Sequence, residues 1–147
     1  MHRVSLPTTF AGALMVAVAA SMLLQPARAE TVTFKADLQG ASEVPATASK
    51  GIGTGAITFD TVTKKLDYKV TYSGLSGAAT MGHIHGPAEV GSNAGVVIPF
   101  ANAASPIDGT AILTDAQAAD LLAGKMYVNV HTAENKGGEI RGQIIKP

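Results

Sequence analysis

The chain has 147 residues, with 11 basic and 11 acidic side chains and no cysteine. The basic residues form no cluster, which argues against nucleic-acid binding, because that binding depends on the neutralisation of phosphates. Without cysteine the protein has no disulfide, no thiolate metal ligand and no thiol nucleophile. Its stability must therefore come from the packing of its core.

Residues 1–29 have the three parts of a secretory signal peptide. His2 and Arg3 form a short basic start, residues 10–24 are apolar, and an A-x-A cleavage site ends at Ala29. A membrane anchor is the alternative, but spanning needs about 20 apolar residues, and polar residues end this run early. We expect a secreted or periplasmic protein that begins at Glu30 and has no membrane span after signal removal.

The remaining chain, residues 30–147, has the usual size of one domain and contains no linker or repeat that would divide it. Alternation of apolar and polar side chains predicts strands over 31–39, 51–59 and 65–72. A hairpin loop at 60–64 joins the second of these strands to the third.

Residues 81–85 are expected to form a strand that carries two histidines. The apolar run 96–100 contains a proline, which favours the edge of a sheet, and 109–113 predicts a further strand. Thr114 is expected to be a helix N-cap, with Gln117 as its capping-box partner. The short helix 116–122 then ends before a C′ glycine, Gly124.

Two strands close the chain, over 126–131 and 139–145. In the last one we expect Ile140 and Ile144 to point inward and Glu139, Arg141 and Gln143 to point outward. About eight short strands with one short helix predict an all-β protein, an antiparallel Greek-key sandwich or barrel.

The three histidines of the predicted mature chain fall in two short segments. His83 and His85 project from the same face of a strand, together with Met81, because residues two apart share a face. His131 lies in the segment 127–132. Neutral imidazoles suit copper, zinc or nickel, and three histidines with one open position form a sound zinc site.

We therefore predict a metal site made by His83, His85 and His131, with copper or zinc as the ion. Met81 is a candidate fourth ligand, and its thioether would favour Cu(I). The alternative is a structural role, in which the ring nitrogens bond to the backbone of the loop after Gly86.

Other polar residues near these segments admit more than one interpretation. Glu139 and Arg141 could form an ion pair, Glu139 could orient a metal-bound histidine, or both could lie on a solvated face where a pair contributes little. Tyr127 and Asn129 face the same side as His131 and are expected to line the same pocket. Glu43 is read as a turn residue. No nucleophile-elbow motif supports a Ser-His-Asp hydrolase.

Three separated blocks of the sequence match the pattern of one known family, in order. The blocks are Phe34-Lys35-Ala36-Asp37-Leu38-Gln39-Gly40 with Glu43-Val44-Pro45, Gly82-His83-Ile84-His85-Gly86-Pro87-Ala88, and Tyr127-Val128-Asn129-Val130-His131-Thr132 with Gly137-Gly138-Glu139-Ile140-Arg141-Gly142-Gln143. Together they resemble the CHRD domain, a family named after chordin and widespread in bacterial secreted proteins. The resemblance implies an extracellular β-rich domain and assigns no settled biochemical activity. In chordin the domain belongs to a protein that binds growth factors.

A weaker resemblance links Gly82-His83-Ile84-His85 to the copper-binding Gly-Phe-His-x-His strand of copper/zinc superoxide dismutase. His131 would stand for that family's late copper histidine, but the fourth histidine, the zinc ligands and the cysteine pair have no counterpart. We therefore expect a non-enzymatic binding or structural module whose partner is a metal ion or an extracellular protein. The alternative is a copper-dependent redox enzyme on a dismutase-like scaffold.

We predict that the exported protein starts at Glu30, because the A-x-A site ends one residue earlier. Intact-mass spectrometry of protein recovered outside the cytoplasm measures this directly. A mass that still includes residues 1–29 would contradict the predicted cleavage.

Overall fold

Eight strands form one antiparallel sheet in the computed structural model, which describes residues 30–147. The predicted signal peptide, residues 1–29, lies outside the described residues. The strands are β1 (Thr31–Gln39), β2 (Ile52–Asp60), β3 (Lys65–Ser73), β4 (Ala79–His85), β5 (Val96–Pro99), β6 (Ile107–Ile112), β7 (Tyr127–Thr132) and β8 (Ile140–Gln143).

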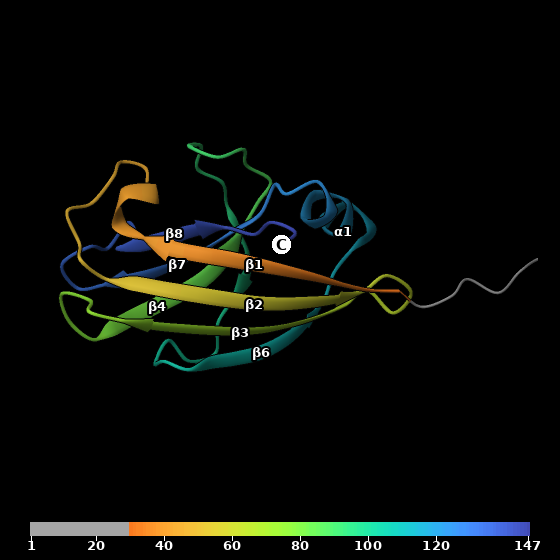
Figure 1. Cartoon of the computed structure of the whole chain (residues 1–147), viewed down its shortest axis with the longest axis horizontal. Helices are drawn as coiled ribbons and strands as arrows, with labels where there is room; N and C mark the ends of the chain where they lie inside the picture. Colours follow the sequence, from red (N-terminus) through yellow and green to blue (C-terminus); the bar gives the residue numbers. More distant parts are fainter. Residues whose placement is uncertain (1–29) are drawn as a thin grey trace, which may run out of the picture.

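The strand order is β5-β4-β7-β8-β1-β2-β3-β6. The chain moves between the two halves of this order after β3, after β5 and after β6, which is the kind of crossing that a Greek key uses. Figure 1 shows β4 and β7 passing behind the layer of β1, β2 and β3, so the sheet curls into a nearly closed barrel or sandwich. The predicted all-β architecture is confirmed.

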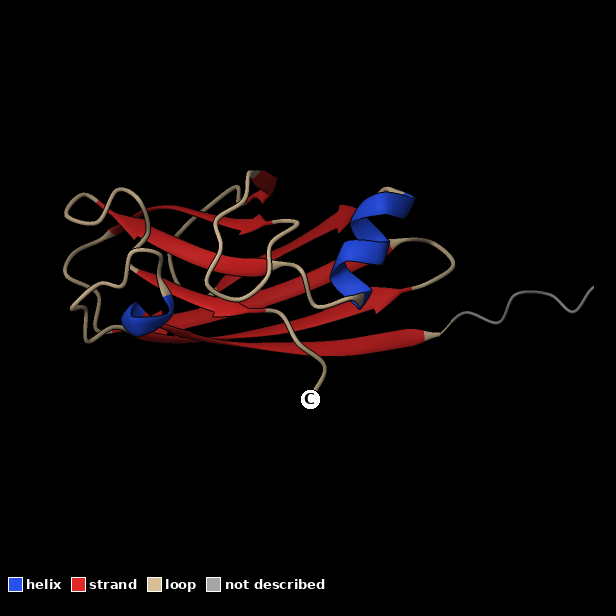
Figure 2. Cartoon of the chain, turned by 90° about the horizontal axis from the view of Figure 1, so that it is seen from above, coloured by secondary structure: helices blue, strands red, loops and turns tan. Residues whose placement is uncertain are grey.

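One short α-helix, α1 (Asp115–Leu122), and one 3-10 turn, η1 (Gly40–Ser42), accompany the strands in the described part of the chain. The predicted capping box is present, since Thr114 Oγ1 accepts from the Gln117 backbone and Gln117 Oε1 accepts from the Thr114 backbone. Gly124 follows the C-cap with φ of 73°, a conformation that glycine adopts without strain. Figure 2 shows α1 packed against one end of the sheet.

None of the helices between residues 30 and 147 has the length and apolar character that a membrane crossing requires.

β5, which contains Pro99, is the outermost strand at one end of the sheet order. The expected edge position of the proline-containing run is therefore confirmed.

The core is built from the inward-facing residues of the strands, with two residues from α1. Ile84, Val128 and Val130 have no exposed surface, as their alternation with polar residues predicts. The buried cluster comprises Phe34, Ala36, Leu38, Ile57, Phe59, Leu66, Tyr68, Val70, Ile84, Ile98, Ile107, Leu113, Ala118, Leu121, Met126, Val128, Val130, Ile140 and Ile144.

The outward face of β7 and β8 is also buried, which differs from the sequence prediction. All six residues of β7 are buried, and Glu139 and Arg141 are 0% and 2% exposed. The loops at 40–51 and 86–95 fold over this face, since Ser49 Oγ donates to Glu139 and Arg141 donates to the Ser92 carbonyl. The interpretation of Glu139 and Arg141 as a solvated strand face is therefore wrong. A buried polar layer lies there instead.

We predict that Val130→Ala lowers the free energy of unfolding by about 1–3 kcal/mol, because the change removes buried methyl groups from a packed core. Urea denaturation measures this difference. Val62→Ala, at a hairpin residue that is 47% exposed, is the control and should stay within about 0.5 kcal/mol of the parent. Equal effects of the two changes would show that the assigned register of β7 is wrong.

Candidate metal centre

The antiparallel pairing of β4 with β7 brings the two histidine segments together. Residues directly opposite each other in such a pair point to the same side of the sheet. All three histidines consequently point into the polar layer, while their strand neighbours enter the core. The opposed pairs on the polar side are Met81 with His131, His83 with Asn129, and His85 with Tyr127.

The three imidazoles converge on one point together with the side-chain amide of Asn129. His83 Nδ1 lies 3.0 Å from His131 Nε2. Asn129 Oδ1 lies 3.0 Å from His85 Nε2 and 3.0 Å from His131 Nε2. One ring nitrogen from each histidine lies within 4.8 Å of the others. The structure therefore brings together the three residues that the sequence singles out, and it places Asn129 among them.

Backbone carbonyls set the tautomers of two of the histidines. His85 Nδ1 lies 3.0 Å from the Ala94 carbonyl, and His131 Nδ1 lies 2.9 Å from the Lys136 carbonyl. A carbonyl oxygen only accepts, so each Nδ1 carries the proton and donates it. In the neutral rings each Nε2 consequently presents a lone pair to the cluster. The expected bond to the loop after Gly86 exists for His85, but it leaves the inner nitrogen free to act as a ligand.

Burial and the neighbouring rings favour the neutral form of His83 and His85. Burial lowers the pKa of His83, and the nearby His131 and His85 rings lower it further. Burial also lowers the pKa of His85, and this effect outweighs the Ala94 carbonyl and the Asn129 oxygen, which favour the charged ring. Neutral imidazole is the form that binds a metal, because the charged form has no free lone pair.

The His85 ring is held by a stack of side chains. Its plane is nearly parallel to the Tyr127 ring, at 4° with centroids 4.9 Å apart. The Arg141 guanidinium lies 3.4 Å from the centre of the Tyr127 ring, in cation-π geometry. Arg141 in turn donates to Ser92 and Asn93 of the covering loop. Tyr127 thus lines the same site as the histidines, as the strand pattern predicts, and it limits the rotation of His85.

Glu43 is a buried neighbour of the cluster that the sequence does not reveal. It is 6% exposed rather than a solvated turn residue. Burial raises its pKa to about 7, against the lowering effects of the Arg141 charge, the Val44 backbone and the Asn129 amide. Its Oε1 has no hydrogen bond of good geometry with the described residues. A Cβ at Gly138 would collide with this oxygen and with Asn129 Nδ2, so both atoms lie over the glycine.

Met81 lies opposite His131 in the β4–β7 register and is 47% exposed. It therefore borders the cluster on its solvent side. His83 is partly exposed, whereas His85 and His131 are 8% and 6% exposed. The cluster is thus open to solvent near His83 and Met81 and closed beneath them.

Glu139 neither pairs with Arg141 nor orients a histidine. Its two carboxylate oxygens accept four hydrogen bonds of 2.6–2.7 Å, from Ser49 Oγ, the Ser76 backbone, Ser76 Oγ and Thr132 Oγ1. Burial alone would raise its pKa, but these hydrogen bonds outweigh that effect and lower the pKa to about 2. Glu139 is therefore an ionised anchor that ties two loops to the ends of β7 and β8.

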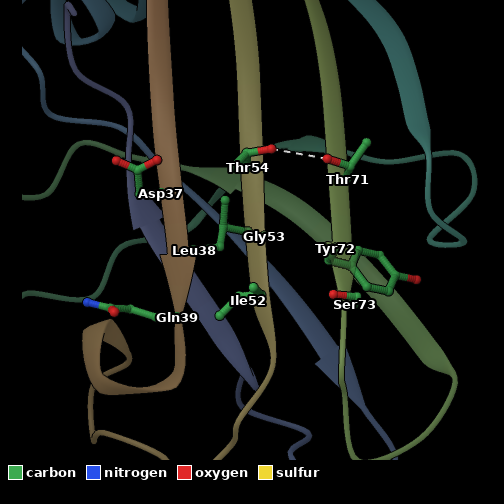
Figure 3. Close-up of a pocket in the computed structure, with 9 residues that line it drawn as sticks. All are labelled: Asp37, Leu38, Gln39, Ile52, Gly53, Thr54, Thr71, Tyr72 and Ser73. Atoms are coloured by element: carbon green, nitrogen blue, oxygen red, sulfur yellow. Dashed lines mark hydrogen bonds between the residues drawn. The ribbon is translucent and has the colours of Figure 1, made fainter.

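A separate hollow of about 500 Å³ lies on β1, β2 and β3, strands that carry none of the histidines (Figure 3). Thr54 and Thr71 point toward each other there, with their hydroxyls 3.1 Å apart. The lining includes the exposed Ile52 and a single carboxylate, Asp37. This hollow lacks the convergent donor atoms of the histidine cluster, so the cluster is the better candidate site.

Comparison with known families matches residues 34–144 to the family described as CHRD domain. The matched range contains the three histidines, Asn129 and Glu43. No curated protein and no solved structure matches the chain. The resemblance to copper/zinc superoxide dismutase is therefore not shown by these comparisons.

We predict that the protein loses stability in acid through Glu139. Its pKa is lowered on folding, so its contribution is present above the ordinary value of 4.5 and disappears as the pH falls toward 2. The Glu139 carboxylate is fully buried beneath the covering loops. With allowance for screening by the nearby solvent, we expect its ionisation to contribute about 1–2 kcal/mol to the free energy of unfolding. Urea denaturation at pH 7 and pH 3 measures the change.

Glu139→Gln is the comparison for this measurement, because the amide does not titrate while Glu43 and the surface carboxylates remain. The variant should be less stable at pH 7 and should lose less stability than the parent on acidification. The same loss of stability in both proteins would show that the hydrogen bonds do not lower the pKa of Glu139.

Proposed function

The chain belongs to the CHRD-domain family, and we propose that it is a non-enzymatic binding module that holds one transition-metal ion, copper or zinc. His83, His85 and His131 are the ligands in this proposal. The ion would bind in the polar layer between β4, β7 and the loops at 86–95 and 132–139.

The observation that carries the proposal is the orientation of His85 and His131. Each ring donates its outer Nδ1–H to a backbone carbonyl, at 3.0 Å and 2.9 Å, and turns Nε2 inward to a point 3.0 Å from Asn129 Oδ1. Metal-binding histidines in proteins typically have such a partner on the far nitrogen, which sets the tautomer and the angle of the ring. These orientations gather both Nε2 atoms and His83 Nδ1 around Asn129 Oδ1 and one another.

The chemistry of the donor atoms supports copper or zinc. Imidazole nitrogen suits both ions, whereas calcium and magnesium prefer oxygen. The rings project from paired strands and are braced by Tyr127 and Asn129, so little conformational freedom is lost when an ion binds. The partly exposed His83 gives an ion access from solvent.

We also propose that the protein acts outside the cytoplasm, as a secreted or periplasmic protein. The signal-peptide pattern of residues 1–29 supports this location, and CHRD domains are commonly extracellular. Such a location would expose the site to extracellular or periplasmic metal ions.

The test is metal analysis of protein purified without chelator, followed by calorimetric titration of the metal-free protein with Cu(II) and with Zn(II). We expect one ion per chain for at least one of the two metals. The variant with His83, His85 and His131 all changed to Gln should bind at least 100-fold more weakly, because it loses all three imidazole ligands.

Lys69→Gln, at an exposed position of β3, is the matched control and should bind like the parent. Far-UV circular dichroism verifies that the triple variant is folded. Unchanged uptake by the folded triple variant would reject the site and leave a structural role for the histidines.

A further inference from the structure

We infer that Asn129 completes this centre as a fourth ligand through Oδ1, and that the resulting three-nitrogen, one-oxygen set is arranged for Cu(II). The inference rests on the proposed function, because it concerns the ion held by the same three histidines. It adds a ligand and an oxidation state that the histidines alone do not determine.

The spacing of the donor atoms is the first argument. His83 Nδ1, His131 Nε2, Asn129 Oδ1 and His85 Nε2 follow one another with three successive separations of 3.0 Å. Two ligand atoms about 2.0–2.1 Å from one ion and 3.0 Å apart enclose an angle of roughly 90–97° at that ion. A tetrahedral ion with the same bond lengths needs separations of roughly 3.3–3.4 Å. Each of the three separations therefore fits the angle of about 90° between neighbouring ligands in the tetragonal arrangement that Cu(II) prefers.

The polarity of these atoms is the second argument. The Nδ1–H groups of His85 and His131 are already donated to Ala94 and Lys136, so each neutral ring directs a lone pair at Asn129 Oδ1. A carbonyl oxygen has no proton to share with two lone pairs at 3.0 Å. The lone pair of His85 Nε2 and the Asn129 carbonyl oxygen therefore repel each other, and a cation between them turns the repulsion into coordination.

Glu43 accounts for the orientation of the Asn129 amide. Its Oε1 and Asn129 Nδ2 lie together over Gly138, on the side of the amide away from the histidines. Oε1 accepts whether the carboxyl group is ionised or carries a proton on its other oxygen. It therefore attracts the NH2 group and would repel the carbonyl oxygen, so the amide keeps its oxygen on the histidine side. Glu43 thus acts as a positioning residue for this ligand.

The donor set also distinguishes the oxidation states of copper. A carbonyl oxygen suits a divalent ion, whereas Cu(I) is selected by soft sulfur ligands. The nearest soft candidate, Met81, is 47% exposed and lies at the rim of the cluster. Asn129 is 3% exposed and sits between two of the histidines, so we assign the fourth position to Asn129.

The experiment compares Asn129→Asp, Asn129→Leu and Met81→Leu in Cu(II) binding, measured by competition with a chelator. A carboxylate at position 129 keeps the oxygen donor and adds charge, so we expect Asn129→Asp to bind Cu(II) at least tenfold more tightly. Asn129→Leu should bind at least tenfold more weakly. Met81→Leu should stay within about twofold of the parent, and none of the Asn129 changes should alter Cu(I) affinity by more than threefold.

A spectroscopic measurement on the unmodified sequence removes any dependence on how the variants fold. Pulsed electron paramagnetic resonance of the Cu(II)-loaded protein, grown with ¹³C-labelled asparagine, should show coupling to ¹³C as well as to three imidazole nitrogens. The other asparagines, Asn93, Asn102 and Asn135, do not contact the ring nitrogens of the cluster that face the proposed ion.

Absence of the ¹³C coupling, or unchanged Cu(II) binding in Asn129→Leu, would overturn the assignment of Asn129. If the histidine variants still abolish binding in that case, the proposed function stands and only the fourth ligand is wrong. If the parent protein binds no Cu(II), the inference is overturned, and Zn(II) titration then decides whether the proposed function fails with it.

Discussion

β4 and β7 pair antiparallel with Ile84 opposite Val128 and Gly82 opposite Val130, and the branched side chains of these pairs all enter the core. Burial of each such side chain contributes about 1.5–3 kcal/mol. A slip of one residue would turn the apolar set outward and the histidines into the core. The same energy that holds the two strands in register therefore holds His83, His85 and His131 on one side of the sheet. The geometry of the candidate centre is a by-product of core packing.

The polar layer over β7 and β8 supplies the rest of that geometry. Buried polar groups are costly unless they are hydrogen-bonded, and Glu139 meets this requirement with four donors from Ser49, Ser76 and Thr132. These bonds, with those of Arg141 to Ser92, close the covering loops onto the sheet. The loop at 86–95 carries the Ala94 carbonyl, and the connection from β7 to β8 carries the Lys136 carbonyl, and these two carbonyls set the histidine tautomers. The histidine lone pairs therefore point in defined directions only when the outer polar layer is ordered.

Local patterns in the sequence predict the strands, the capping box of α1 and the shared face of His83 and His85, because each depends on neighbouring residues. From the sequence alone, the proximity of His131 to His83 and His85 is only a hypothesis, because the pairing of strands far apart in the sequence depends on the whole fold. The burial of Glu139 and Arg141 could not be predicted. The loops that cover them have no periodic pattern, and polar residues opposite a core are usually solvated. Asn129 was expected near His131, but its place between two ring nitrogens depends on side-chain directions.

The central claim is that one metal ion is shared by the three histidines. The most direct test is a crystal structure of the copper-loaded protein, with anomalous diffraction recorded on both sides of the copper absorption edge. We expect a single strong copper peak about 2.0–2.1 Å from His83 Nδ1, His85 Nε2 and His131 Nε2. A copper peak elsewhere on the protein, with the three imidazoles bonded only to one another and to the backbone, would contradict it.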